Sequence, residues 1–181
     1  MPFTPYHFGP SGFIGLLFRK WLDIPVFVLA NVVVDVEVLV IVLFKLGYPV
    51  HRYCHTLLIG GIVGAVWGAA AYPLRNLFEK TMRIFRLNYE PTLRKMILSG
   101  ILGVWLHVLL DGAQHADMRI FWPNTTFSLW KLVYRHLGNH RIEDACVVFF
   151  LLAGVAYLFA TRSFARDNAD RTQATSNTKA E

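Results

Sequence analysis

The sequence contains few charged residues and very few cysteines. Charged side chains make up 17% of its 181 residues, whereas soluble domains typically carry about a quarter. Two cysteines, Cys54 and Cys146, do not make a disulfide framework. The sequence also lacks a glycine-rich phosphate loop followed by Lys-Ser/Thr, an H-E-x-x-H motif and a serine elbow. These absences exclude disulfide-rich domains and the common motifs of nucleotide-binding proteins, zinc peptidases and serine hydrolases.

Apolar residues, by contrast, are abundant and occur in long runs. Hydrophobic residues make up 55% of the chain, which includes 14 Phe and 5 Trp, and the mean hydropathy is +0.41. The length suits a single domain, which we expect to be membrane-embedded over residues 1–166 and followed by a disordered polar tail at residues 167–181. The first apolar stretch, residues 13–18, is short and has no small-residue cleavage site before Trp21, so we expect an uncleaved anchor.

Four windows approach the length and apolarity of a membrane span, which needs ~20 residues. They cover residues 24–44, 56–74, 96–112 and 145–161. The second window is rich in Gly and Ala at i, i+4 spacing, which allows helices to approach closely. The sequence therefore predicts an all-α integral membrane bundle of about four transmembrane helices, with an additional short helix at the N-terminus.

Basic residues indicate how such a bundle would be oriented. Residues 75–95 carry six basic residues against two acidic ones, so we expect this loop in the cytoplasm. Arg19, Lys20 and the basic residues after the fourth window suggest that both chain termini are also cytoplasmic, in a prokaryotic inner membrane. The net charge of +6 and the pI of about 9.5 then reflect loops that face anionic lipid. We therefore expect membrane lipid, and not nucleic acid, as a partner.

Two carboxylates lie near the middle of the first window. Asp35 and Glu37 would each cost several kcal/mol at that depth unless paired, ligated or protonated. Two residues along a helix correspond to a turn of ~200°, so the two acids cannot share a face. We expect one of them to point into the bundle. The alternative is a structural pair with a buried Arg or His.

Two pairs of ligand-type side chains follow at helical spacing. His51 and His55 come shortly after Pro49, which suits the first turn of a helix, so both would project from one helix face and could bind one ion. His107 and Asp111, also four residues apart, could ligate together or form a ligand and the group that orients it. The alternatives are two interfacial histidines and a structural His–Asp pair.

The predicted topology brings both pairs to the outer half of the bundle, next to Asp35. Imidazole and carboxylate ligands together suit zinc, with manganese or iron as alternatives. Because thiolates are few and carboxylates numerous, we expect an open or binuclear catalytic centre in which the ion activates water and Asp35 and Asp111 take part in catalysis. Further candidate ligands are Glu37, His115, His140 and Asp144.

Several of these motifs also carry a resemblance to a known family. Met1-Pro-Phe-Thr-Pro-Tyr-His7, residues 31–37, His51-Arg-x-x-His55-Thr and His107-x-x-Leu-Asp111 occur in this order within residues 1–125. This order resembles the bacterial and archaeal membrane-bound proteins described as predicted metal-dependent hydrolases, a family distantly similar to the zinc-dependent phospholipase C and P1 nuclease group.

The resemblance implies hydrolysis of an ester, in particular a phosphate ester. It also implies a set of metal ligands: His7, Asp35, His51 or His55, His107 and Asp111. The further His-x-x-x-Glu pair of the phospholipase C group is matched only by His140-x-x-x-Asp144. His7 must reach the outer cluster although Arg19 and Lys20 favour the inside, so residues 11–22 would be re-entrant or the orientation reversed.

Two classes of function are therefore open. The first is a membrane-embedded metal-dependent hydrolase that acts on a lipid-like or phosphorylated substrate. The second is a non-enzymatic membrane protein, either an ion- or proton-coupled transporter or a helical bundle that binds haem through histidine pairs. Clustered carboxylates disfavour haem, and the lack of an evident inverted repeat disfavours a transporter.

Overall fold

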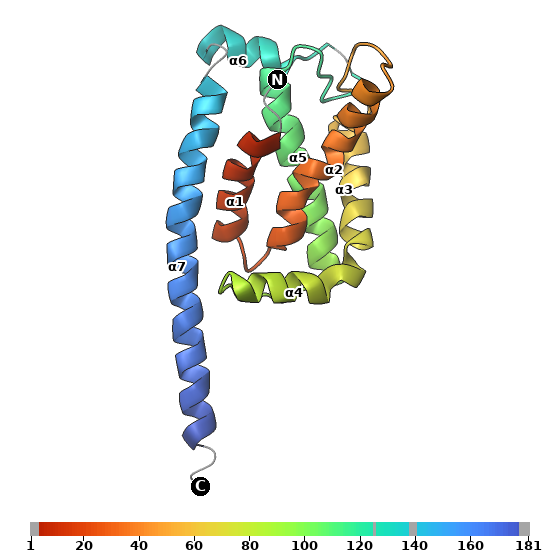
Figure 1. The fold of residues 1–181 in the computed structure, drawn as a ribbon. Coiled ribbons are helices and arrows are strands. Elements are labelled where there is room, and N and C mark those ends of the chain that lie inside the picture. Colours follow the sequence, from red (N-terminus) through yellow and green to blue (C-terminus); the bar gives the residue numbers. More distant parts are fainter. Residues whose placement is uncertain (1–3, 125, 138–140, 178–181) are drawn as a thin grey trace.

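The computed structural model describes residues 4–124, 126–137 and 141–177. In this part of the chain every regular element is a helix, which confirms the all-α class (Figure 1). The elements are η1 (Thr4–His7), α1 (Phe8–Leu17), α2 (Ile24–Leu43), α3 (Leu57–Ala70), η2 (Tyr72–Leu74), α4 (Arg75–Ile84), α5 (Leu93–Gln114), α6 (Leu129–Leu137) and α7 (Arg141–Asn177).

Three helices are long and apolar enough to cross a membrane: α2, α5 and α7. They correspond to the first, third and fourth predicted windows. The second window differs, because α3 has only 14 residues, and thus a rise of about 21 Å. It continues through η2 into α4 with a bend of 41°. The bundle therefore has three candidate spans, or four if the bent pair counts as one.

Helix α5 packs against both α3 and α2 and lies near the middle of the bundle (Figure 1). Glycines bring α3 and α5 together: a Cβ atom added at Gly100 would meet the carbonyl oxygen of Gly64, and one added at Gly68 would meet the carbonyl oxygen of Met96. These contacts agree with the close helix approach that the small residues predict. Gly103 packs in the same way against the Phe27 carbonyl of α2.

The N-terminal helix lies inside the bundle, packed against α7 and α2. Figure 1 shows that η1 begins at the end of the bundle where α5 ends, and that α1 turns into α2 near the opposite end, where α4 lies. His7 and Arg19 are therefore directed to opposite ends. The described N-terminal residues and the end of α7 also lie at opposite ends, which does not agree with the expectation that both termini share one side.

Side-chain caps define where three helices start. Asp23 Oδ1 accepts from Val26 N at 3.2 Å at the start of α2. Thr56 Oγ1 accepts from Ile59 N at 3.1 Å, and Thr92 Oγ1 accepts from Lys95 N at 3.2 Å. Such caps satisfy amide groups that would have no partner at a helix end. The cap at Thr56 places His55 immediately outside α3.

Two sequence expectations differ from the structure. The helix expected near Pro49 is absent: residues 47–56 form turns and extended chain, and α3 begins at Leu57. The prediction that His51 and His55 share a helix face is therefore wrong. At the other end of the chain, α7 continues as a helix to Asn177, where a disordered tail was expected from residue 167.

Candidate metal centre

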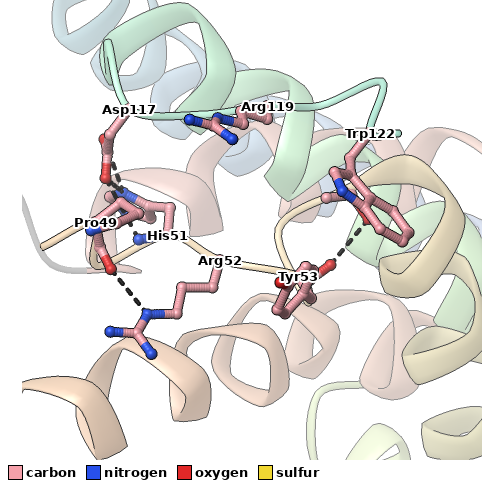
Figure 2. A pocket seen from close by; sticks show the side chains of 8 residues that line it. Pro49, His51, Arg52, Tyr53, Asp117, Arg119 and Trp122 are labelled. Carbon is pink, nitrogen blue, oxygen red and sulfur yellow. Dashed lines mark hydrogen bonds and ion pairs between the residues drawn. The ribbon is translucent and has the colours of Figure 1, made fainter. Parts of the chain in front are cut away.

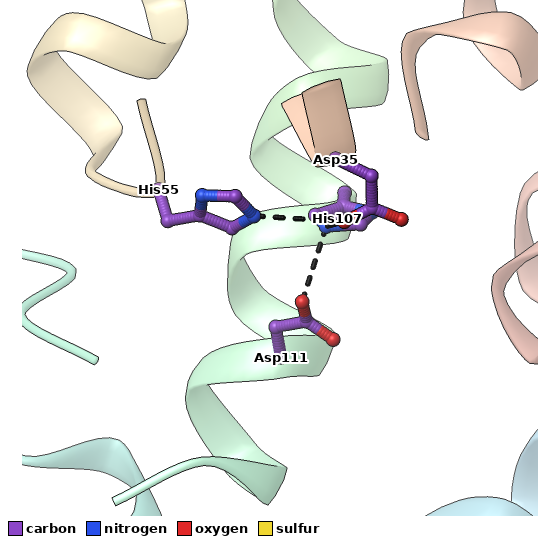
Figure 3. Close-up of side chains that lie close together, drawn as sticks. All are labelled: Asp35, His55, His107 and Asp111. Carbon is purple, nitrogen blue, oxygen red and sulfur yellow. Dashed lines mark ion pairs between the residues drawn. The ribbon is translucent and has the colours of Figure 1, made fainter. Parts of the chain in front are cut away.

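Four ligand-type side chains lie close together between the helices (Figure 3). Asp35 comes from α2, His55 from the loop before α3, and His107 and Asp111 from α5. One donor atom from each residue lies within 4.8 Å of the others. Three of the residues are buried and Asp35 is partly exposed. The helical spacing of His107 and Asp111 places both on the face of α5 that looks toward Asp35.

The nitrogen and oxygen atoms of these four side chains lie close to one another. His107 Nε2 lies 3.3 Å from Asp35 Oδ1 and 3.1 Å from Asp111 Oδ2. His55 Nε2 lies 3.7 Å from Asp35 Oδ1. Among the described residues, none forms a hydrogen bond with His55 Nε2 or with either ring nitrogen of His107. The contacts thus have ion-pair distances without the alignment of hydrogen bonds.

The buried nitrogens that lack a hydrogen-bond partner allow a test of whether a cation fits this site. A buried donor or acceptor left unsatisfied costs about 1–3 kcal/mol, and two carboxylates that face each other repel. A divalent cation among Asp35, His55, His107 and Asp111 would remove both costs. The nitrogen and oxygen donors match those of zinc sites with carboxylate ligands. The four side chains therefore fit a metal ion.

Glu37 fixes the orientation of His55 from the other side. Its Oε2 lies 2.8 Å from His55 Nδ1, and its two oxygens accept from the backbone amides of Arg52 and Cys54, each at 3.1 Å. The Nε2 atom of His55 is thereby directed at the cluster, the carboxylate–histidine arrangement common to metal sites. Asp35 and Glu37 thus both contact histidines of the site, although the sequence suggested that only one of them would point into the bundle.

The charges around His55 and Cys54 indicate what each can contribute. Burial lowers the pKa of His55, but the Asp35 and Glu37 carboxylates outweigh burial and leave this pKa above 6.5. The surroundings therefore favour positive charge. Burial and the negative charge of Glu37 raise the pKa of Cys54 to about 11. Cys54 belongs to neither group of ligand-type side chains, and this raised pKa favours the thiol form at neutral pH.

Two more predicted ligands, His7 and His51, surround Asp111. His7 Nε2 lies 2.9 Å from Asp111 Oδ1, and the His7 ring stacks on His107 with the ring centroids 4.6 Å apart. His51 Nε2 lies 3.8 Å from Asp111 Oδ2. The Asp111 carboxylate thus faces three imidazoles. The structure brings the residues that the resemblance implied close together, including both alternatives, His51 and His55.

A second group adjoins the first through His51. The donor atoms of His51, His115 and Asp117 lie within 4.8 Å of one another. His51 Nδ1 is 3.2 Å from both Asp117 oxygens, and its ring stacks on His115 at 4.5 Å. Burial raises the pKa of Asp117, but the His51 contacts outweigh it and lower this pKa below its usual value.

The remaining candidates do not join these groups. Asp144 is exposed on α7, and neither group of ligand-type side chains includes it. His140 lies outside the described residues. The structure therefore offers no counterpart, within the residues it describes, to the additional pair implied by the resemblance.

A cavity of about 330 Å³ opens beside His51 (Figure 2). Trp122 and Tyr53 form one wall through an edge-to-face ring contact at 5.5 Å. Arg119 lies across the cavity, and its guanidinium has no ion-pair partner among the described residues. Arg52 also lines it while donating to the Pro49 and Leu46 carbonyls. A cationic and aromatic cavity thus adjoins the histidine and carboxylate cluster.

No family model, curated protein or solved structure matches this chain. The class of protein is therefore described from the fold and the side-chain cluster alone. It is a helical protein with three helices that could cross a membrane, and it carries His and Asp groups that could hold a metal ion.

Proposed function

We propose that the protein is a membrane-embedded metal-dependent hydrolase. The observation that supports this most directly is the four-residue cluster, in which the donor atoms of two histidines and two aspartates lie within 4.8 Å of one another. His55 Nε2 and His107 Nε2, which have no hydrogen-bond partner among the described residues, both lie within ion-pair distance of Asp35 Oδ1. When bound, a divalent cation, with zinc the best match, would lower the pKa of water toward ~7 and polarise an ester.

The residues of the cluster take different roles in this proposal. His55, His107 and Asp111 are the most enclosed and hold the ion. The side chain of Asp35 is 24% exposed, against 6% for Asp111, so Asp35 is the carboxylate that can accept a proton from an attacking water. Glu37 and Asp117 orient His55 and His51. Such orienting groups typically affect metal affinity 10- to 100-fold.

The adjoining cavity supports an anionic ester as the substrate. A guanidinium pairs with the oxygens of a phosphate in a defined geometry, and Arg119 is available for this contact. Tyr53 and Trp122 offer apolar surface to the remainder of the substrate. Hydrolysis would join the water oxygen to phosphorus and break the bond to the alcohol, which leaves with a proton. We therefore propose a phosphate ester with an apolar or lipid-like part.

The orientation follows from the distribution of basic residues. We propose that the end with α4 and the basic residues 75–95 faces the cytoplasm. The metal centre draws His107 and Asp111 from the last part of α5, which ends away from α4 (Figure 1), and would thus act near the outer leaflet of a prokaryotic inner membrane. This orientation places the described N-terminal residues outside and the end of α7 inside.

Metal content and hydrolysis test the proposal together. Protein purified without chelator should contain stoichiometric metal by elemental analysis. It should hydrolyse chromogenic phosphate mono- or diesters or fluorogenic phospholipids, and a chelator should abolish the activity. Asp35→Asn should retain most of the metal but lose turnover, because the proton acceptor is removed.

Asp144→Asn is the matched control, since this aspartate is exposed and belongs to neither group of ligand-type side chains. It should retain both metal and activity. Purified protein without metal would refute the metal site. Stoichiometric metal with no hydrolysis of phosphate or carboxylate esters would refute the enzyme and favour a non-enzymatic role.

A further inference from the structure

A second cavity lies at the end of the bundle opposite the metal centre. It has a volume of about 330 Å³ and is lined by Arg19, Lys20, Asn88, Glu90, Lys95 and Ser163. These residues come from the turn between α1 and α2, the connection between α4 and α5, the first turn of α5, and α7. Three cationic side chains face it, against one carboxylate. The cavity therefore has the charge of an anion-binding site.

One of the three cations, Lys95, is held in place by contacts with the backbone. Lys95 Nζ donates to the Arg19 carbonyl at 3.2 Å and to the Glu90 carbonyl at 3.5 Å. An ammonium group has three donors, so one remains for a ligand. These contacts tie the turn after α1 to the start of α5. The wall is thus built by two segments 76 residues apart in the chain.

Exposed apolar side chains neighbour the cationic residues of this cavity in the chain. Leu17 is 54% exposed, Phe18 42% and Trp21 66%, and these residues flank Arg19 and Lys20 in the chain. The rings of Phe18 and Trp21 are 6.0 Å apart. Tryptophan is enriched where a membrane meets water. A ligand here would meet positive charge at one part and an apolar surface at the other.

The helix α4 lies across the same end of the molecule (Figure 1). It buries Phe78 and Met82 and exposes Lys80 and Arg83. A helix with one apolar and one charged face that crosses the end of a bundle is suited to the interface plane of a bilayer. The cavity is thus at the level where phospholipid head groups lie. Basic pockets between membrane helices on this side bind anionic head groups in other proteins.

We propose that this cavity binds a phospholipid with a net negative head group, such as phosphatidylglycerol, in the leaflet away from the metal centre. The phosphate contacts Arg19, Lys20 and Lys95, and the acyl chains lie along Leu17, Phe18 and Trp21. The site is independent of the proposed hydrolase activity. Its ligand stabilises the turn between α1 and α2 against α5.

Lipid binding is measured with detergent-purified full-length protein. Phosphatidylglycerol should raise its melting temperature more than phosphatidylcholine of the same acyl chains does. Brominated phosphatidylglycerol should quench tryptophan fluorescence, and the quenched share should fall in Trp21→Phe. The double variant Arg19→Gln/Lys20→Gln should weaken phosphatidylglycerol binding by about fivefold for each cation removed, with binding of phosphatidylcholine unchanged.

Lys80→Gln/Arg94→Gln is the matched control, because it removes the same charge from α4 and the start of α5, at the same end of the bundle, without changing a residue that lines the cavity. It should leave phosphatidylglycerol binding within twofold of the unmodified protein. An equal loss in both double variants would overturn the site and indicate diffuse surface attraction. Full competition by glycerol phosphate at similar concentration would overturn the lipid and indicate a soluble anion instead.

The variants can be checked for folding without reference to lipid. Lys20 is exposed and the Arg19 side chain only caps the Leu16 carbonyl at 3.5 Å. The lipid-free melting temperature and the metal content should therefore match those of the unmodified protein. Unchanged binding in a double variant with these properties would also overturn the proposal.

Discussion

The two halves of α5 have different roles: the first packs closely against neighbouring helices, and the second carries ligand-type side chains. In the first half, Gly100 and Gly103 let the neighbouring helices approach until backbone atoms touch. In the second half, His107 and Asp111 fill the space between helices with polar side chains. About two turns separate Gly100 from His107.

The two halves have different free-energy costs, and each cost is offset by a different interaction. The packing half gives up side-chain contacts and gains close van der Waals contact between helices. The ligand half buries imidazoles and carboxylates that require partners, and a bound cation would supply what the neighbouring residues do not. Substitutions in the ligand half should therefore change metal affinity, whereas those in the packing half should change stability at unchanged metal affinity.

Asp111→Asn should have the largest effect. Asp111 faces His107, His7 and His51, and the amide cannot supply the charge that a divalent cation requires. We expect metal affinity to fall by more than the 10- to 100-fold that orienting groups cost. Competition with a metal-sensitive dye measures this affinity. Asp144→Asn should leave it unchanged, and a variant that retains full affinity would exclude Asp111 as a ligand.

Glu37→Gln should have a smaller effect on the same property. The amide can still accept from the backbone, but it no longer raises the basicity of His55 through the 2.8 Å contact with Nδ1. Metal affinity should fall 10- to 100-fold. Glu79→Gln is the control, because it alters an exposed ion pair with Arg83 on α4. Equal affinities for both variants would show that Glu37 only supports the loop.

Gly100→Val tests the packing half. Its side chain would meet the Gly64 carbonyl, and overpacking of this kind costs about 1–3 kcal/mol. The unfolding midpoint in a denaturing detergent should fall, while the folded fraction binds metal with unchanged affinity. Gly154→Val is the control, since no atom lies within 4 Å of an added Cβ atom there. A loss of metal affinity in Gly100→Val would mean that the two halves are not separable.

Parts of this arrangement could be predicted from the sequence because they depend on local geometry. The i, i+4 spacing alone directs His107 and Asp111 to one face of a helix. Long apolar runs define α2 and α5 without knowledge of their neighbours. The glycines that pack α3 on α5 were also evident from composition.

Other parts depend on contacts between distant segments. The conformation of residues 51–55 is set by Glu37, 15 to 18 residues earlier, through two amides and one imidazole. Pro49 suggested a helix there because its preference for a first turn is local. The contact of His51 with Asp117 spans 66 residues, and no spacing in the sequence indicates it.

Thr56→Ala should have the smallest effect, and it lies where the two regions meet. Thr56 Oγ1 caps α3, the helix of the glycine interface, and donates to the Tyr53 carbonyl at 2.8 Å beside His55. Loss of a cap costs about 1 kcal/mol, measured as a lower unfolding midpoint. Because Glu37 still holds His55, metal affinity should change by less than the Glu37→Gln variant shows. Thr56→Ser retains the hydroxyl and should restore the midpoint; failure to do so would assign the loss to the missing methyl group and not to the cap.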